Sequence, residues 1–495
     1  MSKRLNWNQL LSNDRDEKTS KKERKQKWDN RIYSKVDFDK VCFMSSFRRL
    51  QDKAQIFPLE KGDFVRSRLT HSIEAMTIAE SIGNEIINII NHKEKGNLNL
   101  DKNLLKNIPY ILKTAALIHD IGNPPFGHLG EEIIKEWFKN NLPRLSYHNE
   151  ENAKMLFQKT DGSGNNTLEK FMQGYIDDFT KFDGNAQALR IVENLQNICI
   201  TKNGITNGLE LSYPLLATII KYPFNPITKK TYNDEDPKKL GYFLSERELY
   251  MDIQLKLGLE HRRHPLVFAL EAADDIAYLC SDLEDSVKKG LVDFKYIREH
   301  IKSAMDDAKN NGNTQVERKL LSLYNLFDGE NHDKETMFYK IQINCAHIRG
   351  RLINDVRTEF SSKYNYIMNG TYNESLLTSS PFSKYVDNFI RKILIEKVYY
   401  SEKIVRQKII ARKTLYGLLD IFVISALNRF GSDNKDLSDP LHNLLISENF
   451  SNICKYNIRD IVDKKQRLYY KILLVLDYIS GMTDYHAIEV YNIIR

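Results

Sequence analysis

The sequence predicts a mainly α-helical fold with at most one short β-hairpin. Apolar residues recur at helical spacing through most of the 495-residue chain, which is the pattern of amphipathic helices. Polar segments rich in turn-forming residues separate these stretches. The composition, 41% hydrophobic and 28% charged residues, is typical of globular proteins and supplies enough apolar surface for a buried core.

The length and the charge distribution predict a large cytoplasmic protein. A chain of 495 residues exceeds one ordinary core, so we expect two domains or one large helical domain with appended subdomains. Charged side chains interrupt the most apolar stretches, residues 108–121 and 469–482, so no membrane span is expected. The polar start contains no signal-peptide pattern. The five cysteines lack paired spacing, which argues against a disulfide framework and a cysteine zinc site.

Basic residues crowd near the N-terminus, although the net charge of the chain is only +7. They are Lys18, Lys21, Lys22, Arg24, Lys25 and Lys27. Two interpretations stay open: a solvated arm, or an arm that contacts phosphate or nucleic acid.

Three segments predict the helices that carry the candidate chemistry. The first has apolar residues at Leu69, Ile73, Met76, Ile82, Ile86 and Ile89, the second at Ile108, Ile111, Leu112, Ala115 and Ile118. In the third, Val267, Leu270, Asp274 and Tyr278 share one helix face.

The segments between the helices are predicted to be loops or turns. Residues 201–211 could form a short β-hairpin, because Asn207-Gly208 supports a tight turn. The turn-rich stretches are residues 159–167, 201–208, 225–239, 306–314, 328–334 and 431–440. Neither a Walker A sequence nor a strand-associated G-x-G-x-x-G is present, so phosphate would have to be bound by side chains and a metal. A serine-hydrolase elbow is also absent.

Two imidazoles and two carboxylates are candidate metal ligands. His119 and Asp120 end an apolar helix, where an ionised group without partners would cost several kcal/mol. His71 begins the first long helix, and Asp274 interrupts the apolar face of the third. Such a mixed nitrogen and oxygen set suits Mn²⁺, Fe²⁺, Co²⁺, Ni²⁺, Zn²⁺ or Mg²⁺. Taken singly, each residue also fits a structural role. Either histidine could be a structural residue with satisfied hydrogen bonds, Asp120 could cap the turn, and Asp274 could form an ion pair.

The ordered set His71, His119-Asp120 and Asp274 resembles the signature of HD-domain phosphohydrolases, and residues 119–131 resemble their dGTP triphosphohydrolase branch. Companion segments run nearly the whole length: residues 47–51, 66–72, 182–187, 221–223, 273–278 and 477–484. The resemblance implies an HD-domain helical bundle with additional helical subdomains. We expect a basic N-terminal arm at residues 1–40, a catalytic core at 41–300, and a C-terminal helical region at 301–495 that completes the active site and the oligomer interface.

By this resemblance, one divalent metal ion per subunit, Mn²⁺ or Mg²⁺ first, would be held by His71, His119, Asp120 and Asp274. Family members hydrolyse a deoxynucleoside triphosphate to deoxynucleoside and intact triphosphate, and dGTP is the expected substrate here. The ion would polarise the α-phosphate and activate a water. His128 and Glu131 are the expected general acid or base pair, because positions i and i+3 share a helix face.

The resemblance also implies substrate-binding residues. Arg68, Lys221 and Tyr222 match positions on the phosphate side. Lys239 and Arg467 match more loosely, and each also fits an ordinary surface cation. Tyr278 would pack under the deoxyribose and disfavour a 2′-hydroxyl, or would equally fit a place in the core. Gln55 and Asp282 would face the base and the nucleoside pocket.

Oligomerisation and regulation rest on the resemblance alone. Family members form homo-oligomers, often tetramers or hexamers, and some respond to dNTP effectors or single-stranded DNA. Residues 399–419 match the family only loosely, which leaves base specificity and effector control open. Two alternatives remain: an HD phosphohydrolase for another nucleotide, or a nucleic-acid-binding regulatory protein with an inert HD site.

Overall fold

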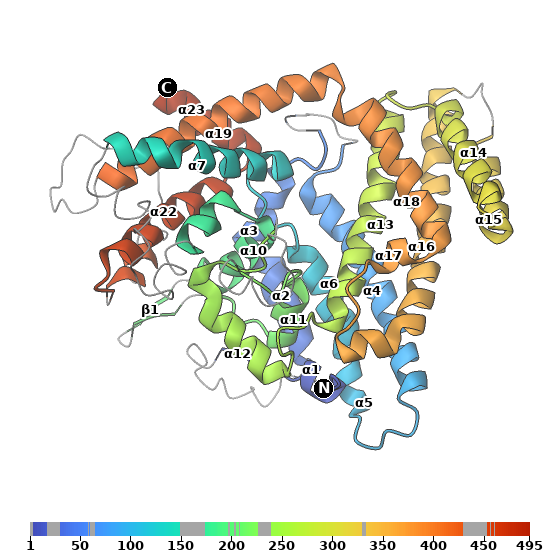
Figure 1. Ribbon diagram of the computed structural model, residues 1–495, viewed down its shortest axis with the longest axis horizontal. Helices are drawn as coiled ribbons and strands as arrows, with labels where there is room; N and C mark the ends of the chain where they lie inside the picture. The colour runs from blue at the N-terminus through green and yellow to red at the C-terminus, as the bar shows by residue number, and fades with distance from the viewer. Residues whose placement is uncertain are drawn as a thin grey trace.

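A computed structural model describes most of the chain. The described residues are 3–16, 30–57, 59, 65–148, 174–196, 199–201, 204–206, 208–225, 239–328, 333–428, 453–455, 457–459 and 461–495. The basic residues 18–27 and the predicted loops at 159–167 and 431–440 lie outside them. Nearly all regular structure in the described part is helical (Figure 1), which confirms the predicted fold class. No helix of the described residues is both long and apolar enough to cross a membrane.

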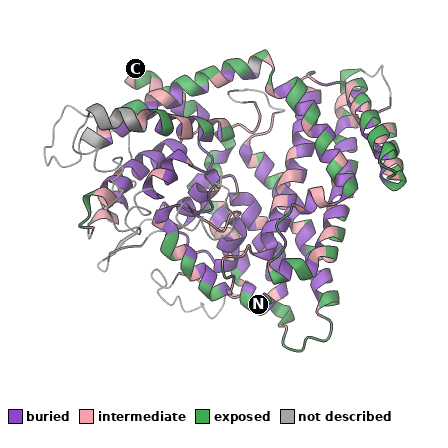
Figure 2. Ribbon diagram, viewed as in Figure 1, coloured by how far each residue is buried: buried purple, intermediate pink, exposed green. Residues whose placement is uncertain are grey.

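Four helices form the centre of the molecule: α4 (Arg68–Lys93), α6 (Asn107–Ile118), α13 (Pro265–Lys288) and α16 (Lys334–Asn369). α4 packs against the other three, and α13 packs against α6 and α16. Their apolar side chains belong to the larger of two buried hydrophobic clusters. Figure 2 shows that buried residues gather on the inward faces of these helices.

Helix α4 illustrates how the sequence specifies these elements. Ser67 caps the helix and forms a capping box with Thr70, which satisfies backbone donors of the first turn. Ile78, Ile82 and Ile86 are buried one turn apart. Ile73, which the sequence pattern assigned to the same apolar face, is 43% exposed. The residues that are buried around it in α4 are His71, Ser72 and Ala75. That assignment was wrong.

A second hydrophobic cluster joins α7 (Gly127–His148) to α19 (Glu402–Asn428), α22 (Lys464–Ser480) and α23 (Asp484–Ile494). These helices lie on one side of the molecule in Figure 1, opposite α14 (Phe294–Asn310) and α15 (Thr314–Leu326). The C-terminal half of the chain therefore supplies helices on both of these sides of the molecule. The remaining helices are α1 (Trp7–Leu10), α2 (Tyr33–Phe43), α3 (Ser45–Arg49), η1 (Leu50–Asp52), α5 (Lys102–Leu105), α10 (Gly184–Asn194), α11 (Tyr213–Ile219), η3 (Leu244–Glu246), α12 (Arg247–Leu257), α17 (Leu376–Ser379), α18 (Pro381–Leu394) and η4 (Ile395–Tyr399).

The N-terminal residues of the described part are packed rather than free. Trp7 is 3% exposed, and its indole nitrogen donates to the Tyr364 hydroxyl at 2.8 Å. Leu10 of α1 is fully buried. Part of the segment expected to be an arm, residues 1–40, thus belongs to the core.

The β structure of the described residues is one hairpin, as the sequence allowed, but its turn is elsewhere. Strands β1 (Cys199–Thr201) and β2 (Gly204–Thr206) are antiparallel, with Thr201 opposite Gly204. The connection is therefore residues 202–203 and not Asn207-Gly208. Gly208 instead adopts a φ of +89° and donates its N–H to the Gln196 carbonyl at 2.7 Å, a conformation that glycine adopts without strain.

Candidate active site

Three helices bring distant residues together. His71 lies in the first turn of α4, His119 directly follows α6, and Asp274 lies in the middle of α13. Because these helices pack against one another, the three side chains meet. One candidate ligand atom from each lies within 4.8 Å of the others, so these residues could hold a metal ion. We call His71, His119 and Asp274 the metal group.

Asp274 is at the centre of this group. Its Oδ1 lies 3.1 Å from His71 Nε2 and 3.2 Å from His119 Nε2. The two imidazole rings are 5.5 Å apart between centroids. The three side chains therefore surround a common centre.

The donor atoms fit a cation. Nε2 of His71 and Nε2 of His119 both face Asp274 Oδ1. Nε2 of His119 is buried and makes no geometrically acceptable hydrogen bond in the described part of the chain, and a buried polar atom without a partner calls for an explanation. Nδ1 of His119 lies 2.7 Å from the Ala116 carbonyl. This contact assigns the ring proton to Nδ1 and leaves Nε2 as a ligand, the arrangement typical of metal-binding histidines.

The electrostatics of the group also favour a positive charge at its centre. Burial lowers the pKa of His119, but the carboxylates of Asp120 and Asp274 raise it to about 9. Burial raises the pKa of Asp274, but His119 and His71 hold it well below its usual range. A proton here relieves the repulsion between the carboxylates of Asp120 and Asp274, and a divalent cation can supply the same compensation.

Asp120 lies beside this group. Its Oδ2 accepts a hydrogen bond from Arg68 Nη1 at 2.5 Å, and its Oδ1 accepts one from Asn123 Nδ2 at 2.6 Å. Oδ1 is 3.6 Å from His119 Nε2. Burial raises the pKa of Asp120, but Arg68 and His119 hold it below its usual range. The carboxylate is thus ionised and oriented by two neighbours.

The turn after Asp120 lies unusually close to α10. A Cβ atom on Gly122 would lie 2.0 Å from the Gly184 carbonyl oxygen, and one on Gly184 would lie 2.6 Å from Glu131 Oε1. Both positions therefore need glycine. The close approach allows the Gly184 N–H to donate to Glu131 Oε1 at 2.9 Å.

His128 and Glu131 share the first turn of α7, as their spacing predicted. His128 Nδ1 lies 3.5 Å from Glu131 Oε2, and this hydrogen bond raises the pKa of His128. Burial raises the pKa of Glu131, but the bond to His128 and its other partners lower it. The His128 side chain is 74% exposed whereas that of Glu131 is 7% exposed, so water weakens the effect of Glu131 on its partner.

A pocket beside the metal group contains one of the predicted phosphate ligands. Its lining includes His119, Asp274, Lys221 and Glu271. Lys221 Nζ lies 3.4 Å from Glu271 Oε1. The Tyr222 ring has two ammonium groups over it, Lys221 at 6.0 Å and Lys239 at 5.9 Å. The structure thus brings Lys221, Tyr222 and Lys239 together.

The predicted nucleoside residues occupy one face of α13 and the segment before α4. Tyr278 lies one turn beyond Asp274, with the Arg391 guanidinium 5.6 Å from its ring centroid. Asp282 is 1% exposed, and burial raises its pKa well above the usual value. Its Oδ2 and the Oε1 of Gln55 are buried without a hydrogen-bond partner among the described residues.

Arg467 is not brought to this centre. It lies on α22, and its Nε donates to the Ile458 carbonyl at 3.4 Å. No contact in the described part joins it to the metal group.

Sequence reasoning assigned no role to three residues that fix the backbone around the site. Lys53 Nζ donates to the carbonyls of Asn123 and Ser480. Asp484, the first residue of α23, accepts from the backbone N–H groups of Ala54 and Phe126 at 3.1 and 2.8 Å. Phe126 has a φ of +64°, which is uncommon for a bulky residue. Such contacts follow from tertiary packing, and only the resemblance in residues 119–131 and 477–484 pointed to this region.

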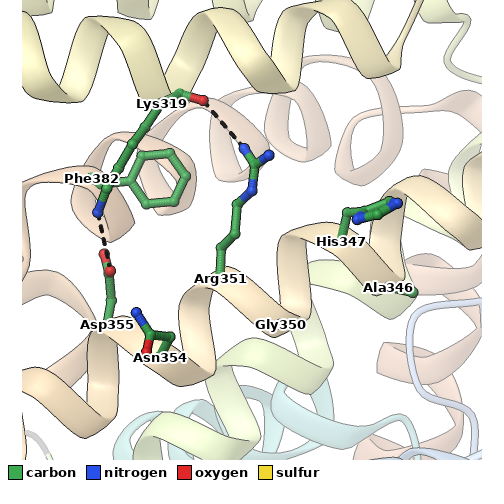
Figure 3. A pocket seen from close by; sticks show the side chains of 8 residues that line it. All are labelled: Lys319, Ala346, His347, Gly350, Arg351, Asn354, Asp355 and Phe382. Carbon is green, nitrogen blue, oxygen red and sulfur yellow. Dashed lines mark hydrogen bonds and ion pairs between the residues drawn. The ribbon is translucent and has the colours of Figure 1, made fainter.

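A second groove lies away from the metal group, between α15, α16 and α18 (Figure 3). Its lining residues are Lys319, Ala346, His347, Gly350, Arg351, Asn354, Asp355 and Phe382. Lys319 Nζ lies 3.4 Å from Asp355 Oδ1, and Arg351 donates to the Lys319 carbonyl at 3.3 Å. None of the predicted site residues lines it, so the metal group is the candidate active site.

Comparisons with known proteins agree with this geometry. The family model of the HD domain matches residues 68–169. The sequence is 36% identical to a deoxyguanosinetriphosphate triphosphohydrolase-like protein of Listeria innocua, over 491 residues and 99% of both chains. The deoxyguanosinetriphosphate triphosphohydrolase of Yersinia enterocolitica is 29% identical over 491 residues and 92% of both chains. This chain therefore belongs to the deoxyguanosinetriphosphate triphosphohydrolase family of HD-domain proteins.

Proposed function

We propose that this protein is a deoxynucleoside triphosphate triphosphohydrolase that converts dGTP to deoxyguanosine and inorganic triphosphate. The convergence of His71, His119 and Asp274 is the observation that carries the proposal, because these residues would form the metal centre of the HD domain. The names of the relatives supply the substrate.

One divalent cation per subunit, Mn²⁺ or Mg²⁺ first, would be held by His71, His119, Asp120 and Asp274. The two nitrogen and two carboxylate donors leave Fe²⁺, Co²⁺, Ni²⁺ and Zn²⁺ open. When bound, the cation supplies a Lewis acid for the α-phosphate and for the attacking water. The Arg68 and Asn123 contacts with Asp120 would hold its carboxylate in place.

His128 would transfer the proton in the reaction. Release of intact triphosphate requires cleavage between the α-phosphorus and the 5′-oxygen of the nucleoside, so this oxygen must gain a proton. The hydrogen bond to Glu131 orients the imidazole and favours its protonated form. The exposure of His128 leaves room for a substrate beside it.

Cationic side chains would bind the triphosphate. Arg68 is 4% exposed, with its Nε unpartnered among the described residues, and Lys221 lines the pocket beside the metal group. Lys239 and Tyr222 lie next to Lys221. Fixed positive charge around phosphate oxygens stabilises the charge of the transition state.

The nucleoside would bind along α13. Tyr278 would pack against the deoxyribose, since it lies one turn beyond Asp274, and Asp282 lies a further turn along the same face. Asp282 Oδ2 and Gln55 Oε1 have no hydrogen-bond partner in the described part of the chain. These two oxygens could accept hydrogen bonds from a base. Arg467 remains a proposed ligand from the resemblance alone.

A product analysis tests the function. Purified protein with Mn²⁺ or Mg²⁺ and a panel of the four dNTPs should release triphosphate and deoxynucleoside in equal amounts, with dGTP the best substrate. Pyrophosphate or orthophosphate would indicate another HD phosphohydrolase. An absence of hydrolysis together with nucleic-acid binding would favour the regulatory alternative.

The assembly and its regulators form a separate part of the proposal. We expect a homo-oligomer, a tetramer or hexamer, with residues 301–495 at its interface, and control by a dNTP or single-stranded DNA. Exposed apolar side chains on α19, such as Val405 and Ile409, support an interface there. Sedimentation with and without each effector measures the oligomeric state.

A further inference from the structure

Lys53 is a buried lysine that the proposed mechanism does not use. It follows η1 and is 3% exposed. In the described part of the chain, its ammonium donates to two backbone carbonyls, Asn123 at 2.6 Å and Ser480 at 2.8 Å. Lysine is almost never fully buried unless it is paired, so this position needs an explanation.

Stability alone does not explain it. Burial lowers the pKa of Lys53 to about 7, although the nearby Asp484 opposes this shift. Desolvation makes the charged form costly, whereas an apolar side chain of similar volume would avoid that cost and lose only the two hydrogen bonds to the carbonyls of Asn123 and Ser480.

The contacts of Lys53 lead to both oxygens of the Asp120 carboxylate. Asn123, whose carbonyl accepts from Lys53, donates its side-chain amide to Asp120 at 2.6 Å. The carbonyl of Lys53 itself accepts from the N–H of Arg68 at 2.9 Å, the residue that begins α4 and contacts Asp120 from the other side. Ser480, the second ammonium partner, is the last residue of α22, where a cation also interacts favourably with the helix dipole.

We propose that Lys53 is a positioning residue for the metal centre: its ammonium holds the turn from Asp120 to Asn123 against the end of α22, and Asn123 in turn orients the Asp120 carboxylate. This inference rests on the proposed function, because it takes Asp120 as a ligand. Lys53 acts through Asn123 and contacts no reacting atom.

Metal binding tests the role independently of turnover. Mn²⁺ is titrated into metal-free protein by calorimetry, and the EPR spectrum of bound Mn²⁺ reports the ligand geometry. Lys53→Met should weaken Mn²⁺ binding by about 10- to 100-fold, the usual effect of removing a group that orients a ligand, and should change the spectrum. Asn123→Ala should do the same. The double variant should bind about as weakly as either single variant, because both changes remove one connection.

Lys113→Met is the matched control. Lys113 lies on α6, the helix that His119 directly follows, and pairs with Glu80 at 3.0 Å. Its ammonium also lies over the rings of Phe38 and Tyr110, and none of these partners belongs to the turn from Asp120 to Asn123. Its loss should leave the Mn²⁺ affinity and spectrum unchanged.

Several results would overturn the role. One is unchanged Mn²⁺ affinity in Lys53→Met, and another is losses that multiply in the double variant. If Lys53→Met does not fold, Asn123→Ala decides the matter, since unchanged affinity there removes the proposed route from Lys53 to Asp120. A wild-type protein that binds none of the candidate divalent cations would overturn the metal site itself, which is a distinguishable failure.

Discussion

Single residues at the metal group supply the candidate ligand atoms, and this makes them sensitive to substitution. His71 is 1% exposed, and its Nε2 lies 3.1 Å from Asp274 Oδ1 at the centre of the group. We expect His71→Ala to remain folded, to bind Mn²⁺ weakly and to lose at least about a thousandfold in kcat/KM, about 4 kcal/mol of transition-state stabilisation.

The matched control is on the same helix. His92 is an exposed residue in the last turn of α4, so His92→Ala should keep wild-type activity. Triphosphate release is measured by ion exchange, and circular dichroism checks the fold. Full activity of His71→Ala would exclude this residue as a ligand.

The pH dependence of activity tests the pair of His128 and Glu131. Because the hydrogen bond to Glu131 raises the pKa of His128, the imidazole stays protonated to a higher pH than a free histidine. Glu131→Gln removes the carboxylate charge, so the pKa of His128 should fall. The limb of the kcat/KM profile that reports His128 should then move to lower pH, whether the residue acts as acid or as base.

His128→Ala completes this test, because it should abolish the limb altogether. Glu132→Gln changes the adjacent, exposed carboxylate of the same helix and should leave the profile unchanged. A profile of Glu131→Gln that superimposes on the wild type would show that Glu131 does not tune His128.

The residue types of the candidate site could be predicted from the sequence, but their exact contacts could not. The i, i+3 spacing of His128 and Glu131 predicted a local contact, and the structure has it. The pairing of Asp120 with Arg68 and the burial of Lys53 depend on how α4, α6 and α22 pack. No local pattern encodes such packing.

At the scale of elements, a buried ion network attaches α10 to α22. Arg190 Nε and Nη2 donate to Asp477 at 2.7 and 2.6 Å, and Nη1 donates to Glu246 at 2.9 Å. All three residues are at most 3% exposed. Asp477→Asn leaves part of the Arg190 charge uncompensated, so it should lower the free energy of unfolding by about 3 kcal/mol.

An exposed ion pair is the control for this network. Glu402 pairs with Arg406 on α19, and their side chains are 80% and 75% exposed. Glu402→Gln should change the free energy of unfolding by less than about 1 kcal/mol. Urea denaturation measures both variants. Equal, small effects would show that the network contributes little to the attachment.

Substitution by alanine should impair activity at one glycine and stabilise the fold at another. Gly122→Ala would place a methyl group 2.0 Å from the Gly184 carbonyl, so the turn must move away from α10 and activity should fall. Gly350 lies inside α16, and a Cβ atom there would have no described neighbour within 4 Å beyond its own helix backbone. Gly350→Ala should therefore raise the free energy of unfolding by about 0.5–1 kcal/mol at unchanged activity. Full activity of Gly122→Ala would contradict the close approach.

The spacing of apolar residues predicted which segments are helical better than it predicted which residues of a helix are buried. The helices expected around residues 69–89, 108–118 and 267–278 correspond to α4, α6 and α13, because sustained helical spacing of apolar residues is a strong signal. The same pattern misplaced Ile73. The Asn207-Gly208 pair suggested the hairpin turn, but Thr201 of β1 is opposite Gly204 of β2, and Gly208 donates to the Gln196 carbonyl.

At the scale of the whole molecule, the C-terminal helices reach the turn that carries the HD pair. Asp484 of α23 accepts hydrogen bonds from Ala54 and Phe126, and the last carbonyl of α22 accepts from Lys53. Each of these three contacts joins residues at least 358 positions apart in the chain. Local patterns in a sequence carry no information about contacts over such separations, so the arrangement of the centre could be known only from the structure.

This long-range support predicts that a substitution in the last helix impairs catalysis. Asp484 is 2% exposed, and Asp484→Ala would leave the backbone donors of Ala54 and Phe126 without their acceptor, at about 1–3 kcal/mol for each buried donor. The turn that begins α7 would then shift, and a displacement of about 1 Å near the reacting groups can cost about a hundredfold in rate. We expect a fall of this order in kcat/KM for dGTP. His486→Ala, on the same helix with its side chain 49% exposed, should keep full activity, and equal activity of the two variants would mean that the end of the chain does not support the site.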